Sequence, residues 1–117
     1  MLEPETSAPA TDPVTYRDKE GQLLTLGEWT RLYGNRDYRQ HKDTQLPGTL
    51  VRTMWEGIDD GVNVACMWHT GVIDEAGRAN TVWEGYWPCT QDEAEAAHEI
   101  AVAKVCEQRQ SAGGQKI

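Results

Sequence analysis

The 117-residue sequence contains no phenylalanine, only three cysteines, and no apolar run approaching the ~20 residues of a membrane-spanning helix. Positive charge is also scarce, because eleven Lys and Arg face nineteen Asp and Glu, for a formal net charge of −8. Binding to nucleic acid or to an anionic membrane depends on clustered cations. The start of the chain lacks the basic and apolar regions of a signal peptide. We therefore expect a cytoplasmic protein that binds neither nucleic acid nor membrane.

The cysteines favour a reducing compartment, because their number is odd and no CxxC motif is present. Two Cys/His pairs invite comparison with metal sites. Cys66 and His69 are three residues apart on a predicted strand and point to opposite faces. His98 and Cys106 are eight positions apart on a predicted helix, a rise of ~12 Å that is too long for one ion. We predict no metal and no other cofactor.

The two ends of the chain are poor in large apolar residues. Residues 1–13 hold three prolines, small residues and acids, and residues 110–117 include Gly113-Gly114. Such segments bury too little apolar surface to offset the entropy of ordering. We expect disordered tails at 1–13 and 110–117, flanking one domain over 14–109.

Two short helices carry clear start signals. Thr25 and Glu28 have the spacing of a capping box, and so do Thr90 and Glu93. The first helix is expected to end at Gly34. Its apolar face carries Leu26, Trp29, Leu32 and Tyr33. The apolar stripe of the second carries Ala94, Ala97, His98, Ala101, Val102 and Val105.

The remaining segments are rich in β-branched and aromatic residues, which favours strands. A small hairpin is expected over 16–23, with its turn at Glu20-Gly21, and longer strands over 50–58, 64–73 and 79–87. Residues 36–44 offer a further strand. Because the turns between them are short, the strands should be antiparallel neighbours. The predicted fold class is α+β, an antiparallel β-meander of three to five strands packed with two short α-helices.

The turn positions suggest a register that pairs Trp68 with Trp83, Cys66 with Met54, and Arg52 with Trp68. One face then carries Leu50, Met54, Val64, Cys66, Trp68, Val72, Trp83 and Trp87. The other carries Val51, Trp55, Met67, His69, Val82, Glu84 and Tyr86. The first set is more apolar, so we expect it to receive the helices.

On the second face, Trp55, Met67, Val82 and Tyr86 form a candidate protein-interaction patch. Exposed apolar surface with aromatic residues commonly marks a partner or dimer surface. A protein partner or a homodimer would fit it. In the alternative interpretation, the first helix, with Trp29 and Tyr33, covers this face.

No catalytic motif is present, including phosphate-binding loops, nucleophile elbows and metalloprotease helices. A Cys/His pair of Cys66 or Cys89 with His98 has no evident third group to orient the base. His98, in an alanine-rich stripe, is typical of a packed histidine. We predict no catalytic residues.

The order of motifs resembles a family of small uncharacterised proteins encoded by actinobacterial phages. Three of the motifs lie near the start: residues 16–21 (YRDKEG), 26–29 (LGEW) and 37–39 (DYR). Residues 51–57 (VRTMWEG) match a V-x-T-x-W-x-G strand, and residues 84–94 with His98 match the closing T-x-x-E-A-x-x-x-H segment. The resemblance spans roughly residues 16–105. It implies a phage accessory role and supplies no catalytic residue.

The leading functional hypothesis is a non-enzymatic accessory protein that binds a host or phage protein in the host cytoplasm. The alternative is a minor structural component of the virion. A Cys/His-dependent enzyme is the third.

Overall fold

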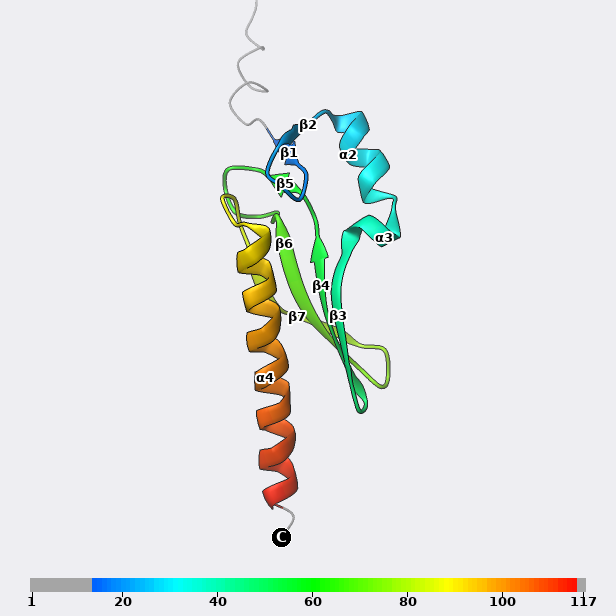
Figure 1. Ribbon diagram of the computed structural model, residues 1–117, viewed down its shortest axis with the longest axis vertical. Helices are drawn as coiled ribbons and strands as arrows, with labels where there is room; N and C mark the ends of the chain where they lie inside the picture. The colour runs from blue at the N-terminus through cyan, green and yellow to red at the C-terminus, as the bar shows by residue number, and fades with distance from the viewer. Residues whose placement is uncertain (1–13, 116–117) are drawn as a thin grey trace, which may run out of the picture.

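The computed structural model describes the backbone of residues 14–115 and the side chains of residues 14–108, so the tail expected over 1–13 lies outside the described residues. The elements run β1 (Thr15–Arg17), β2 (Leu23–Leu24), α2 (Leu26–Tyr33), α3 (Arg36–Arg39), β3 (Gln40–Leu46), β4 (Thr49–Trp55), β5 (Ile58–Asp59), β6 (Trp68–Asp74), β7 (Ala79–Gly85) and α4 (Gln91–Gln115). They form a four-stranded sheet, β3-β4-β6-β7, and a small sheet, β2-β1-β5, both antiparallel (Figure 1). The α+β class is confirmed.

Tight turns close the hairpins of the large sheet. β3 and β4 meet at Pro47-Gly48, where Gly48 has a φ of +73° that a side chain would oppose. Between β6 and β7, the Asp74 amide donates to the Arg78 carbonyl at 2.9 Å. Both turns lie between the strands that the sequence predicts. The hairpin predicted over 16–23 also forms, as β1 and β2, and it pairs Arg17 with Leu23.

The register between β4 and β6 differs from the expected one. Trp55 pairs with Trp68, whereas the predicted register places Arg52 opposite Trp68. The register is displaced by three residues. Because side chains alternate between the two faces of a sheet, a displacement by an odd number moves each side chain of β4 to the opposite face from the predicted one. Val51 and Trp55 are buried, while Leu50 and Met54 are half-buried.

The segment before β6 explains this displacement. The sequence pattern predicts a strand that includes residues 64–67, but β6 begins only at Trp68. The Asp60 carboxylate accepts hydrogen bonds from four successive backbone amides, those of residues 62–65, at 2.7–3.1 Å. These amides are therefore satisfied in a loop, and Val64, expected in the core, is exposed. Because the connection is longer than a hairpin turn, its ends do not fix the register.

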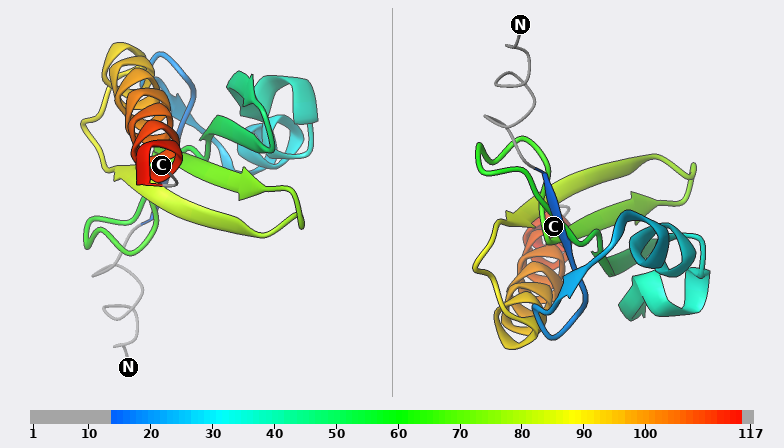
Figure 2. Two further views of the ribbon diagram at one scale, coloured as in Figure 1. Left: turned by 90° about the horizontal axis from the view of Figure 1, so that it is seen from below. Right: turned by 90° about the horizontal axis from the view of Figure 1, so that it is seen from above.

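Helix α4 lies against one face of the large sheet (Figure 2). Thr53, Trp55 and Thr70 are on this face, because the Thr53 hydroxyl meets both His98 of α4 and Thr70, and Trp55 shares a core cluster with Ala94 of α4. Small buried residues, Ala94, Ala97 and Ala101, allow the close approach of α4. The predicted stripe is therefore confirmed, since four of its six residues are buried and Val102 and Val105 are half-buried. The helix is longer than expected. It has 25 residues and continues to Gln115, beyond the predicted end of the ordered domain near residue 109.

Helix α2 contacts the small sheet and α3 contacts β3 and β4, on the side of the large sheet away from α4 (Figure 1). Side chains of both helices pack against the core cluster that contains Trp55. Helix α2 begins after Thr25 with the capping box that the sequence predicts. Residues 36–39 form α3, whereas the sequence analysis expects a strand there. The Asn35 side chain caps α3 by accepting from the amides of Asp37 and Tyr38.

The two capping boxes lead to a stability prediction. Thr25 Oγ1 accepts from the Glu28 amide at 3.1 Å, and Thr90 Oγ1 accepts from the Glu93 amide at 3.2 Å. Replacing either threonine by alanine should lower the free energy of unfolding by about 1 kcal/mol, because a helix amide loses its acceptor. Chemical denaturation measures this, and a Thr30→Ala variant serves as a control within α2. Unchanged midpoints in both cap variants would contradict the assignment.

Candidate functional site

The four residues of the predicted patch do not form one surface. Trp55 and Met67 are almost completely buried, whereas Val82 is 52% exposed and Tyr86 is half-buried. Trp55 lies in the core cluster against which α2 and α3 pack, and the Tyr38 ring meets it edge-on at 4.9 Å. The prediction of an uncovered patch around Trp55 is therefore wrong. The exchanged face of β4 is the reason, because it places Trp55 in the core. Trp29 and Tyr33 of the first helix do pack against the cluster that contains Trp55, but the first helix does not cover the predicted face as a whole, since Val82 and Glu84 are exposed.

Exposed apolar side chains gather instead along the junction of α4 with β7. Ile100 on α4 is 59% exposed and Val82 on β7 is 52% exposed. We call this surface the α4–β7 seam. Its walls are Val72, Val82 and Trp83 from the sheet, and Ala97, Ile100 and Val105 from α4.

Two hollows run end to end along the α4–β7 seam. One of about 560 Å³ extends toward Lys104, and one of about 490 Å³ extends toward Glu93. Trp83, Ala97 and Ile100 line both of them. Adjoining apolar hollows with charged residues at their outer ends are typical of a surface that receives an apolar side chain of another molecule.

The buried centre of the α4–sheet interface is polar. His98 is fully buried, with Nε2 at 2.8 Å from Thr44 Oγ1 and Nδ1 at 2.8 Å from Thr53 Oγ1. Thr53 Oγ1 also meets Thr70 Oγ1 at 2.6 Å. Both ring nitrogens are therefore hydrogen-bonded to hydroxyls, as a packed histidine requires. This arrangement fits a structural histidine, in agreement with the sequence analysis.

His98 should make stability depend on pH. Burial, and then the charge of Lys42, lower its pKa from the ordinary value, against smaller opposing effects of Glu99 and Asp43 and a smaller lowering by His41. The unfolded chain then binds a proton more readily than the folded one. Stability should be fully present above the unfolded-state pKa and decrease as pH falls from about 6.5 toward the folded pKa.

The measurement is the free energy of unfolding between about pH 7 and about pH 5. The slope has an upper bound of about 1.4 kcal/mol per pH unit for one proton. A His98→Gln variant should show a flatter profile over this range than the parent chain. Equal slopes in the two proteins would contradict a buried neutral His98.

Glu56 is the centre of a second cluster, at the end of β4. Its carboxylate accepts from Arg39 Nη2 at 3.0 Å and lies 2.8 Å from His69 Nδ1. Burial acts to raise the pKa of Glu56, but the hydrogen bond from His69 and the charge of Arg39 outweigh it and hold that pKa below its usual value. An ionised carboxylate held by two partners joins α3, β4 and β6. We interpret this ion-pair cluster as a structural clamp between the three elements.

The two buried thiols are poor nucleophiles. Burial, together with the charge of Glu56, raises the pKa of Cys66 to about 12. Burial and the nearby Glu93 raise the pKa of Cys89 to about 11. Both thiols are therefore protonated near neutral pH, whereas nucleophilic cysteines need a thiolate. In the described residues, neither thiol has a hydrogen bond to a histidine.

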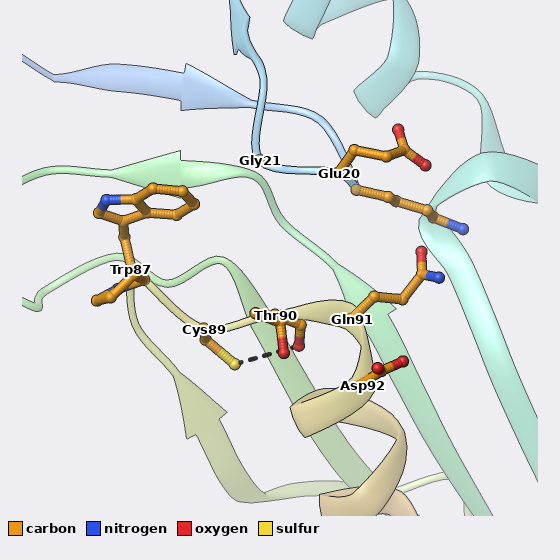
Figure 3. A pocket seen from close by; sticks show the side chains of 9 residues that line it. Glu20, Gly21, Trp87, Cys89, Thr90, Gln91 and Asp92 are labelled. Carbon is orange, nitrogen blue, oxygen red and sulfur yellow. Dashed lines mark hydrogen bonds between the residues drawn. The ribbon is translucent and has the colours of Figure 1, made fainter.

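A smaller hollow of about 370 Å³ lies between the β1–β2 turn and the start of α4 (Figure 3). Trp87 forms one wall, close to Gly21, where an added Cβ would lie 3.0 Å from the indole. Trp87 is partly exposed, whereas the sequence analysis assigns it to the core, and its ring stacks on the Arg17 guanidinium at 3.8 Å. The charges in this hollow are of mixed sign, from Lys19, Glu20 and Asp92, so they favour neither an anion nor a cation.

Within the part of the chain that the structure describes, no three His, Cys, Asp or Glu side chains converge as metal ligands would. His69 and His98, which belong to the Cys/His pairs weighed above, are engaged with Glu56 and with threonines. Over the same residues, no helix combines the length and the hydropathy needed to cross a bilayer.

Compared with protein-family models, curated protein sequences and solved structures, the chain matches none of them.

Proposed function

We propose that this chain is a small phage accessory protein that acts without catalysis, by binding another protein at the α4–β7 seam. The observation that carries the proposal is the exposure of Ile100 and Val82 beside the apolar hollow that Trp83 lines. Isolated exposed apolar residues are ordinary, but exposed apolar residues gathered beside adjoining apolar hollows are a common mark of a protein interface. The resemblance to phage proteins makes a host or phage protein the expected class of partner.

The framework of the seam supports this role. Trp83 belongs to a strand and Ile100 to a helix, and α4 is anchored on the sheet by Ala97 and Ala101. An apolar groove on anchored elements loses little conformational entropy when a partner binds. The protonated state of Cys66 and Cys89 also argues against a nucleophilic enzyme.

Affinity capture from infected host cells tests the proposal. Ile100→Asp places a charge in the seam and should reduce capture of the partner by about tenfold or more, since a buried apolar anchor contributes about 2 kcal/mol or more to binding. Leu26→Asp is the matched control, because Leu26 is 60% exposed on α2, far from the seam in the fold. Loss of capture in both variants, or in neither, would contradict a role for the seam.

A further inference from the structure

Building on the proposed function, we infer that the seam of one chain binds a second copy of this chain, with the two α4 helices antiparallel across a two-fold axis between Ala97 and Ile100. The inference rests on how side chains are spaced along α4. It also rests on the opposite charges at the two ends of the seam.

Four residues of α4 define a single stripe that faces the seam. Glu93, Ala97, Ile100 and Lys104 follow one another at intervals of four, three and four residues, the spacing of one helix face. The hollows place these residues along the seam in the same order. Eleven residues separate Glu93 from Lys104, a rise of about 16 Å, which is three helical turns.

The middle of this stripe is complementary to itself in shape. Ile100 projects from it and is 59% exposed, whereas Ala97 is 9% exposed and lines both hollows. An antiparallel arrangement centred between these two positions places Ile100 of each copy over Ala97 of the other. The small side chain of alanine leaves room for the isoleucine, so each copy offers both a projection and a recess. Such a patch can close an isologous dimer.

The same register brings opposite charges together. When Ile100 lies over Ala97 of the other copy, Glu93 lies opposite Lys104 of that copy, and the symmetric contact repeats at the other end. Lys104 has no ion pair with a side chain of residues 14–108, in contrast to Lys42, which pairs with Glu99. A parallel arrangement would place like charges against each other, which is unfavourable. Charge therefore selects the antiparallel one.

Sedimentation equilibrium of the full chain tests the inference. The parent chain and Leu26→Asp should sediment as dimers. Ile100→Asp should sediment as a monomer with an unchanged circular dichroism spectrum, because Ile100 is largely exposed within one chain. A parent chain that stays monomeric at all concentrations would overturn the inference.

Charge variants test the register. Lys104→Glu should weaken association at low salt, and the deficit should shrink at high salt as the repulsion is screened. Adding Glu93→Gln should recover part of the loss, since it removes the repulsion while glutamine still serves the capping box. A dimer unaffected by Lys104→Glu would contradict the antiparallel register.

The inference and the proposed function can fail separately. If the parent chain is monomeric but Ile100→Asp abolishes capture of a host or phage protein, the second copy is excluded and the seam remains a binding site. If Ile100→Asp changes neither the oligomeric state nor capture, both are overturned.

Discussion

Replacing Trp55 by alanine is expected to lower the free energy of unfolding by about 3–5 kcal/mol, the range for truncating a fully buried aromatic residue. Trp55 is fully buried, pairs with Trp68 across the sheet, and donates from Nε1 to the Arg17 carbonyl at 3.0 Å. Gly57, two residues further along the chain, has a φ of +71° and packs so closely against the Trp55 indole that a Cβ atom would not fit there. The variant therefore leaves a cavity and an unsatisfied carbonyl where β4 meets the small sheet.

Trp87→Ala is the matched control for this experiment. It removes the same side chain from a site that is more than one third exposed, so its cost should be clearly smaller. Equilibrium denaturation of the two variants gives the comparison. If Trp55→Ala were the milder change, Trp55 would lie on an exposed face and the β4–β6 register would be wrong.

Thr53→Val should be the second large effect, although it preserves the shape of the side chain. The Thr53 hydroxyl lies between His98 Nδ1 and Thr70 Oγ1, at 2.8 and 2.6 Å, and all three side chains are buried. Valine has no hydroxyl, so both the His98 ring nitrogen and the Thr70 hydroxyl lose a hydrogen-bond partner while they remain buried. Each such group costs about 1–3 kcal/mol, so we expect a loss in that range or above it.

Thr53→Ser provides the complementary change, because it keeps the hydroxyl and deletes a methyl group. Its cost should be about 1 kcal/mol, the loss for a buried methyl with its small cavity. Thermal or chemical denaturation distinguishes the two. A valine variant more stable than the serine variant would show that packing, and not the hydroxyl network, holds α4 on the sheet.

Local signals in the sequence were sufficient for much of this fold. The capping residues Thr25 and Thr90 start α2 and α4 as predicted, since a cap acts within one turn of its own helix. The turn at Pro47-Gly48, which lies between the strands predicted over 36–44 and 50–58, is similarly local. In contrast, the β4–β6 register depends on how many residues the connection uses, which the Asp60 carboxylate decides by holding residues 62–65 in a loop.

The candidate site could be predicted only in part. Val82 belongs both to the predicted patch and to the α4–β7 seam, but Trp55 and Met67 are in the core. The sequence did contain a sign of the exposed position of Ile100, because Ile100 is a large apolar residue that lies outside the predicted apolar stripe of α4. Its neighbours in the seam come from β6 and β7, so the groove exists only once the helix is placed on the sheet.

Side-chain footprinting with hydroxyl radicals shows whether the α4–β7 seam is the surface that binds a partner or a second copy. The comparison is between the free chain at low concentration and the chain in its assembled or partner-bound state. Trp83 and Ile100 should become protected in the bound state, while Leu23 and Leu26, exposed on the small sheet and on α2, should react equally in both. Protection at Leu23 and Leu26 with an unchanged α4–β7 seam would show that binding takes place on the small sheet and α2, and would rule out the seam as the binding surface.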